Sequence, residues 1–255
     1  GFAHLATLVK QMKASRPGAL LLDGGDTWQG SGTSLWTKGQ DMVDACKLLG
    51  VDVMTGHWEF TLGMERVKEI VEKDFEGKVD FVAQNVKTTD FGDPVFKPYV
   101  IREINGVPCA IIGQAFPYTP IANPRYMVAD WEFGIQDENM QKMVDEARAK
   151  GAQVVVVLSH NGMDVDLKMA SRVSGIDAIL GGERDPQKLA VLRDERCRAD
   201  VATIAAALEG NWHAEHLFAL RQSLALYRTY QQQLSECDRE IETYFATLPD
   251  QCGGQ

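Results

Sequence analysis

The sequence lacks features that would define whole classes of protein. It has no run of about 18 apolar residues, so none of its 255 residues lies in a stretch able to span a bilayer. Positive charge is scarce: the formal net charge is −10. For residues 1–182 we therefore expect neither a nucleic-acid partner nor a membrane partner. The cysteines are odd in number and form no C-x-x-C pair, which argues against a disulfide framework or a zinc ribbon.

The composition changes sharply after residue 182. Residues 1–182 hold 12 Lys, 6 Arg and 20 of the 23 Gly, whereas residues 183–255 hold 1 Lys and 7 Arg. The chain is 45% hydrophobic and long enough to bury a core without disulfides. We predict two domains of different character, one over residues 1–182 and one over residues 183–255.

The first segment alternates strand-like and helix-like stretches. Apolar runs that predict strands cover 18–26, 51–56, 79–86, 152–160 and 176–182, and a hairpin with Asn105-Gly106 at its turn covers 99–116. Helical spacing covers the stretch from Phe2 to Met12, 39–50, 63–75 and 137–151. Strands without polar alternation, separated by helices, predict an α/β domain whose parallel sheet is covered on both faces.

The second segment predicts helices only. Residues 199–208 form a short helical pattern, and residues 213–247 place apolar or large side chains at alternating spacings of three and four. Such a narrow seam is typical of a coiled-coil helix. The pattern agrees with self-association through the helix 213–247. It agrees equally with a helical hairpin that packs on itself.

Polar side chains recur where the predicted strands of the first segment end. Asp26, His57, Asn85 and His160 each follow a different strand. Ligands of open parallel sheets bind beyond the carboxyl ends of the strands, so we expect these side chains to converge. Carboxylate and imidazole donors favour Mn, Fe or Zn over calcium. Each residue alone also has a plainer role, Asp26 as a turn residue and His160 as a buried core histidine.

Longer stretches carry a family resemblance. "GGDTWQG" and "GHWEF", together with "VVVVLSHNGMDVD", resemble the metallophosphoesterases of the 5'-nucleotidase type, which carry G-D-x-x-x-G and G-N-H-E-F. Within that family, the G-H-W-E-F form resembles the SoxB-type thiosulfohydrolases of bacterial sulfur oxidation. The resemblance covers residues 1–182 and implies a layered metallophosphoesterase-type domain of sheets and helices.

The resemblance also implies roles. Asp26 would be a bridging carboxylate, and His57 and His160 would be further metal ligands. Asn85 and Trp58 would line the substrate pocket, Trp58 standing where nucleotidases keep a catalytic histidine. The family holds two Mn²⁺ ions in the periplasm and releases sulfate from a cysteine-bound thiosulfonate on the carrier protein SoxYZ. No residue of the chain is assigned as a protein nucleophile or general base.

Two parts of the family pattern do not occur in this sequence. The Gly-Gly turn at residues 181 and 182 leads to Glu183 and Arg184, where the family has H-T-H. The family's first strand, with its D-x-H pair, would precede Gly1. We therefore expect a truncated domain, a fragment of a thiosulfohydrolase whose activity is impaired because metal ligands are missing at both ends.

The second segment has a resemblance of its own. Residues 183–250 resemble the middle helical region of DEDD-type insertion-sequence transposases, without the catalytic acidic residues of that family. Two other functions therefore compete with the thiosulfohydrolase. One is a 5'-nucleotidase-like phosphoesterase, and the other is a non-enzymatic chimera with a transposase-derived dimerisation helix.

Overall fold

The computed structural model describes residues 2–181 together with Glu236 and Arg239. The helices are α1 (Phe2–Ser15), α2 (Gly32–Trp36), α3 (Gln40–Leu49), the 3₁₀ helix η1 (Trp58–Leu62), α4 (Met64–Glu69), the π-helix η2 (Ile70–Asp74), α5 (Thr119–Ala122), the 3₁₀ helix η3 (Arg125–Val128), α6 (Asp137–Ala149) and α7 (Met163–Arg172). The strands are β1 (Leu22–Asp23), β2 (Val53–Met54), β3 (Asp80–Phe81), β4 (Lys87–Thr88), β5 (Tyr99–Ile104), β6 (Val107–Gln114), β7 (Trp131–Glu132), β8 (Val154–Ser159) and β9 (Ala178–Leu180). Among these described helices, none is long and apolar enough to cross a membrane.

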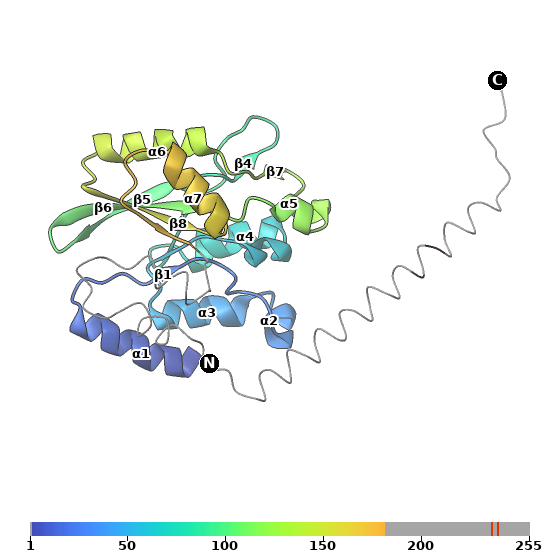
Figure 1. Ribbon diagram of the computed structural model, residues 1–255. Coiled ribbons are helices and arrows are strands. Elements are labelled where there is room, and N and C mark those ends of the chain that lie inside the picture. Colours follow the sequence, from blue (N-terminus) through green and yellow to red (C-terminus); the bar gives the residue numbers. More distant parts are fainter. Residues whose placement is uncertain (1, 182–235, 237–238, 240–255) are drawn as a thin grey trace, which may run out of the picture. The chain divides into compact units, whose positions relative to one another are not determined.

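Two sheets form the middle of this part of the chain. The first has the order β1-β2-β3 and is parallel; the second has the order β5-β6-β8-β9, in which only the β5–β6 pair is antiparallel. Helices α6 and α7 cover the outer face of the second sheet, and α1 and α3 cover the first (Figure 1). The result is a four-layer arrangement of helix, sheet, sheet and helix, in which β2 and most of β6 and β8 are buried.

A small apolar cluster joins the two sheets. Val53 and Val82 from the side of the first sheet pack with Ile111 and Leu158 from the second. At Gly113 the backbone of β6 passes so close to the carbonyl of Val82 that any Cβ would overlap it. The two sheets are therefore in direct backbone contact at Gly113. This close packing brings the carboxyl ends of strands from both sheets together.

Several sequence predictions are confirmed and one is corrected. Helices appear where the spacing predicted them, and Asn105 and Gly106 form the hairpin turn with φ angles of 51° and 82°. The mixed α/β class is confirmed as well. The strands are shorter than predicted: β1 has two residues where the apolar run covers 18–26. The prediction of one parallel sheet is wrong, because the hairpin starts a second sheet that packs face to face with the first.

The predictions for the second segment lie outside the described residues. They are the helix 199–208, the coiled-coil seam 213–247, the all-α tail and the contacts of Glu183 and Arg184. The chain divides into two units, Gly1–Arg184 and Asp185–Gln255. The boundary after residue 182 and the transposase-like character of the tail stay predictions.

Candidate metal centre

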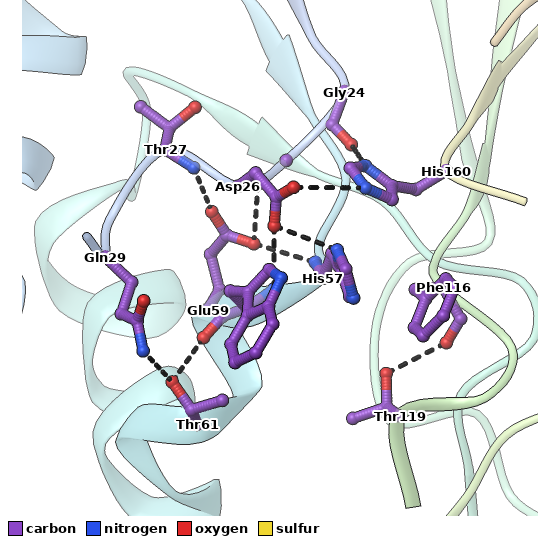
Figure 2. Close-up of polar contacts among 12 residues, drawn as sticks. Gly24, Asp26, Thr27, Gln29, His57, Glu59, Thr61, Phe116, Thr119 and His160 are labelled. Carbon is purple, nitrogen blue, oxygen red and sulfur yellow. Dashed lines mark hydrogen bonds and ion pairs between the residues drawn. The ribbon is translucent and has the colours of Figure 1, made fainter. Parts of the chain in front are cut away.

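Three of the residues predicted from strand ends meet in space. Asp26 follows β1, His57 follows β2 and His160 follows β8, and one potential ligand atom of each lies within 4.8 Å of the others. His57 Nδ1 is 2.9 Å from Asp26 Oδ1, and His160 Nε2 is 3.4 Å from Asp26 Oδ2. Figure 2 shows the two imidazoles on one side of Asp26, each facing one oxygen of its carboxylate. The first sheet supplies two of these groups and the second sheet supplies the third.

The geometry around His57 fits a cation better than a hydrogen bond. Its Nδ1 is buried and, although Asp26 Oδ1 is only 2.9 Å away, it makes no aligned hydrogen bond within the described residues. Burial lowers the pKa of His57 to about 4, an effect that the nearby Asp26 carboxylate opposes and His160 reinforces. The imidazole is therefore neutral near pH 7, the form in which its lone pair can bind a metal.

The ring of His160 is oriented by a backbone group. Its Nδ1 lies 2.7 Å from the carbonyl oxygen of Gly24, which can only accept, so the proton sits on Nδ1. Nε2, which carries the lone pair in the neutral form of the ring, then faces Asp26. Metal-ligating histidines commonly use their second nitrogen in this way. The residues present therefore fit a divalent cation held by one carboxylate and two imidazoles.

Glu59 holds the first half of the centre in place, a role that the sequence analysis did not assign. The side chain is fully buried. Its Oε2 accepts from the backbone N–H of His57 at 2.7 Å and of Asp26 at 3.1 Å. Its Oε1 accepts from the backbone N–H of Thr27 at 2.6 Å (Figure 2) and from that of Trp28 at 3.2 Å. The carboxylate thus fastens the loop after β1 to the loop after β2. Nothing in the motif "GHWEFTLG" indicates that Glu59 binds backbone N–H groups.

The loop after β1 contains a residue with a positive φ angle and a carboxyl group with a raised pKa. Asp26 has a φ of 71°, a left-handed conformation that aspartate tolerates better than most residues. Asp23 accepts from Gly25 N at 3.0 Å and from Thr27 Oγ1 at 2.8 and 2.9 Å. Burial raises the pKa of Asp23 to about 6 despite these bonds. The centre therefore lies beside a second carboxyl group, outside the triad, whose pKa is raised.

Aromatic rings border the triad on one side. The ring of Phe116, in the loop after β6, lies 4.0 Å from that of His57, and Trp58 lies 5.5 Å from it. Trp58 is 40% exposed, and its backbone N–H is 3.4 Å from Asp26 Oδ1. The predicted place of Trp58 in a substrate pocket stays a prediction. Trp58 offers no imidazole for proton transfer at this position.

Asn85 differs from its predicted pocket role. It is fully buried. Its Nδ2 donates to the carbonyls of Ala115 and Gly134, both at 2.8 Å, and its Oδ1 accepts from Ala115 N at 2.8 Å. These bonds use both ends of the amide, so Asn85 ties the loop after β6 to the chain before α6. A position at the end of a strand is shared by residues that line a pocket and by residues that hydrogen-bond the backbone of two segments. The sequence therefore could not distinguish the two roles for Asn85.

Known proteins share sequence with the part of the chain that holds this centre. No protein-family profile matches the chain. The 5'-nucleotidase of Rattus norvegicus is 29% identical over 188 residues, covering 71% of this chain and 32% of the relative. The snake venom 5'-nucleotidase of Naja atra is 29% identical over 189 residues, covering 71% of this chain and 35% of the relative. The chain thus spans about a third of the length of the curated relatives it matches.

Solved structures extend the likeness. Sulfate thiohydrolase SoxB of Thermus thermophilus, in complex with glycerol, is 40% identical with a TM-score of 0.67, covering 71% of this chain and 34% of that one. A 5'-nucleotidase precursor, also of Thermus thermophilus, is 28% identical with a TM-score of 0.61, covering 71% and 35%. The calcineurin-like phosphoesterase YfkN of Bacillus subtilis, 23% identical with a TM-score of 0.63 and covering 71% and 63%, shares the fold.

The described part of the chain shares its fold with a calcineurin-like phosphoesterase, and its acid–imidazole cluster lies where strands of the two sheets end. The sequence matches are to 5'-nucleotidases and to a SoxB protein, and they do not separate these two kinds.

Proposed function

We propose that this chain provides part of a metal-dependent hydrolase, with Asp26, His57 and His160 as ligands of its cations. The observation that carries the proposal is the convergence of these three groups, from two sheets, within 4.8 Å. By the family resemblance the ions are Mn²⁺, two in the intact family site. A divalent cation in such a site supplies Lewis acidity and offsets the charge of an anionic substrate group.

The side chains around the triad have roles of their own. The neutral His57 presents a lone pair without first losing a proton, and the bond from His160 Nδ1 to Gly24 turns Nε2 of His160 toward Asp26. Glu59 keeps the two loops of the first sheet in register, so the ligands need little rearrangement on binding. The rings of Phe116 and Trp58 lie beside His57 and border one side of the centre.

For the substrate we propose a cysteine-bound thiosulfonate on a carrier protein, hydrolysed with release of sulfate. Support comes from the 40% identity with SoxB, against 28% with the 5'-nucleotidase precursor. Trp58 adds a chemical reason, because an indole is a poor proton donor to the leaving group of a phosphate ester. The same resemblance suggests SoxYZ as partner and the periplasm as location.

A 5'-nucleotidase-like phosphoesterase is the second candidate. The curated relatives named above are all 5'-nucleotidases, at 29% identity. Two assays on the Mn²⁺-loaded chain separate the candidates: phosphate release from adenosine 5'-monophosphate, and sulfate release from a cysteine S-thiosulfonate peptide. Sulfate release alone would support the thiosulfohydrolase, and phosphate release alone would overturn it. The third candidate, a chimera that dimerises through residues 213–247, concerns residues outside the described ones.

The metal centre is tested before any substrate. Purified chain is incubated with Mn²⁺, freed of unbound ion and analysed for metal, alongside Asp26→Ala and His160→Ala. Asp145→Ala is the control, because that carboxylate only accepts from Gln141 Nε2 on the surface of α6. We expect metal in the parent chain and the control and little in the two ligand variants. Equal metal in all four proteins would remove the basis of the proposal. Weak hydrolysis with normal metal content would fit the impaired activity expected from the sequence.

A further inference from the structure

A ring of buried hydrogen bonds encloses the turn that carries His160. Asp166, on the first turns of α7, accepts at Oδ1 from Ser159 Oγ at 2.6 Å and from Asn161 Nδ2 at 3.0 Å. Asn161 N donates to Ser159 Oγ at 3.1 Å and closes the ring. Ser159, Asn161 and Asp166 are 2%, 6% and 4% exposed. Both chain neighbours of His160 are therefore fixed to one carboxylate.

The ring is also tied to the neighbouring strand. Gln114, the last residue of β6, donates from Nε2 to Asn161 Oδ1 at 3.0 Å, and its carbonyl accepts from His160 N at 2.9 Å. Gln84 Nε2 donates to Gln114 Oε1 at 2.6 Å. The backbone of His160 is thus held from two directions before any metal is considered. Such networks of buried polar groups rigidify the groups they connect.

The burial of Asp166 lowers the stability of the fold, so a purely structural role does not explain this residue. No ion pair joins it to a lysine or arginine within residues 2–181. Its Oδ2 is buried without a hydrogen-bond partner among the described residues, and it faces Gly181, where any side chain would collide with it. Burial raises the pKa of the Asp166 carboxyl. A buried carboxylate without a cation costs stability.

We propose that Asp166 is a positioning residue for the metal centre, which fixes His160 through Ser159 and Asn161 so that Nε2 faces Asp26. The inference rests on the proposed metal-dependent function. Two other roles for Asp166 make different predictions. A favourable charge at the start of α7 would be shared by the exposed Asp164 on the same turn. A packing role would change stability without changing metal affinity.

The first experiment is titration of the full chain with Mn²⁺ by calorimetry, with thermal unfolding of the metal-free proteins measured in parallel. The variants are Asp166→Ala, Ser159→Ala and the control Asp164→Ala. Loss of an outer-shell partner typically weakens metal binding about 10–100-fold, and we expect this for Asp166→Ala. Ser159→Ala removes one link of the ring and should weaken binding several-fold. Asp164→Ala should bind like the parent chain.

Folding is controlled within the same set. All affinities are measured well below the melting temperature of the variant concerned. If Asp166→Ala does not fold, the Mn²⁺ affinity of Ser159→Ala tests the inference instead. This variant loses only a hydroxyl group, so it should still fold. Parent affinity in folded Asp166→Ala or Ser159→Ala would overturn the inference, as would an equal loss in Asp164→Ala.

A second readout does not need the metal. ¹⁵N NMR of the metal-free chain reports which ring nitrogen of His160 carries the proton, and we expect Nδ1 in the parent because of the carbonyl of Gly24. Asp166→Ala should give a mixture of the two tautomers, and Asp164→Ala should not. If the parent chain binds no Mn²⁺, the proposed function fails, and the tautomer measurement still decides whether Asp166 orients His160. An unchanged single tautomer in Asp166→Ala would overturn the inference.

Discussion

His160 donates its Nδ1 proton to the carbonyl oxygen of Gly24 across 2.7 Å, and this bond joins the loops that follow β8 and β1. The two strands belong to different sheets. A ligand from the second sheet is thereby oriented by the backbone of the first, while Glu59 fastens the two loops of the first sheet to each other. The relative placement of the sheets is therefore part of the metal centre.

Trp58 is the residue at which the two proposed substrates are best distinguished. Its backbone N–H contacts Asp26 and its indole lies 5.5 Å from the ring of His57, at the position where the family resemblance places a histidine in nucleotidases. Trp58→His should raise phosphate release from adenosine 5'-monophosphate relative to sulfate release from a thiosulfonate peptide, because an imidazole can protonate the leaving oxygen. Trp58→Phe is the matched control and should leave the ratio of the two rates near that of the parent chain. A ratio unchanged by the histidine would contradict a role for this position in substrate choice.

Replacing Glu59 should damage both stability and metal binding. In Glu59→Gln an amide N–H₂ replaces one of the oxygens that accept from four backbone N–H groups. Each oxygen accepts from two of these groups, and leaving a buried donor unsatisfied costs about 1–3 kcal/mol, so we expect the free energy of unfolding to fall by about 2–6 kcal/mol. Chemical denaturation measures it. Glu146→Gln, which alters an exposed pair with Lys150, is the control and should change stability much less. Similar losses in both variants would contradict the clamp.

Asp23 should make the stability of the metal-free chain depend on pH. Its pKa is about 6 in the folded chain and near 3.9 when unfolded, so the folded state holds the proton more tightly. The free energy of unfolding should therefore fall as the pH rises from about 4 to about 6, by about 3 kcal/mol at most. Asp23→Asn should remove this slope. Denaturation of both proteins at several pH values gives the difference, and parallel curves would contradict the expectation.

Cys46 should be inert in the folded chain. Burial, reinforced by the nearby carboxylate of Asp23, raises the pKa of its thiol to about 12. At pH 8 only about one thiol in ten thousand is then a thiolate, the form that reacts with iodoacetamide. Mass spectrometry of the peptide that contains Cys46 should show negligible alkylation under native conditions and full alkylation in urea. Rapid native labelling would mean that the packing around α3 is looser than described.

Local pattern was sufficient for several parts of the fold and site. The Asn105-Gly106 turn, the helices bounded by glycine and the ligand types at the strand ends follow from backbone preferences and from the position of each residue in its own segment. Asp26, His57 and His160 could be selected in this way because each lies in the stretch that ends or follows a predicted strand. Asn85 satisfied the same rule and is nevertheless a backbone clamp.

The sequence by itself thus determined the kinds of groups available, an acid and two imidazoles placed after strands, and the α/β character of residues 1–182. Tertiary structure alone decided that two sheets, and not one, carry these groups, and that Glu59 and Asp166 secure them. The physical reason is that a carboxylate or amide accepts any donor within reach. Which donors are within reach depends on how distant segments pack, and that packing is set by apolar contacts between the sheets, which do not involve the polar residues themselves.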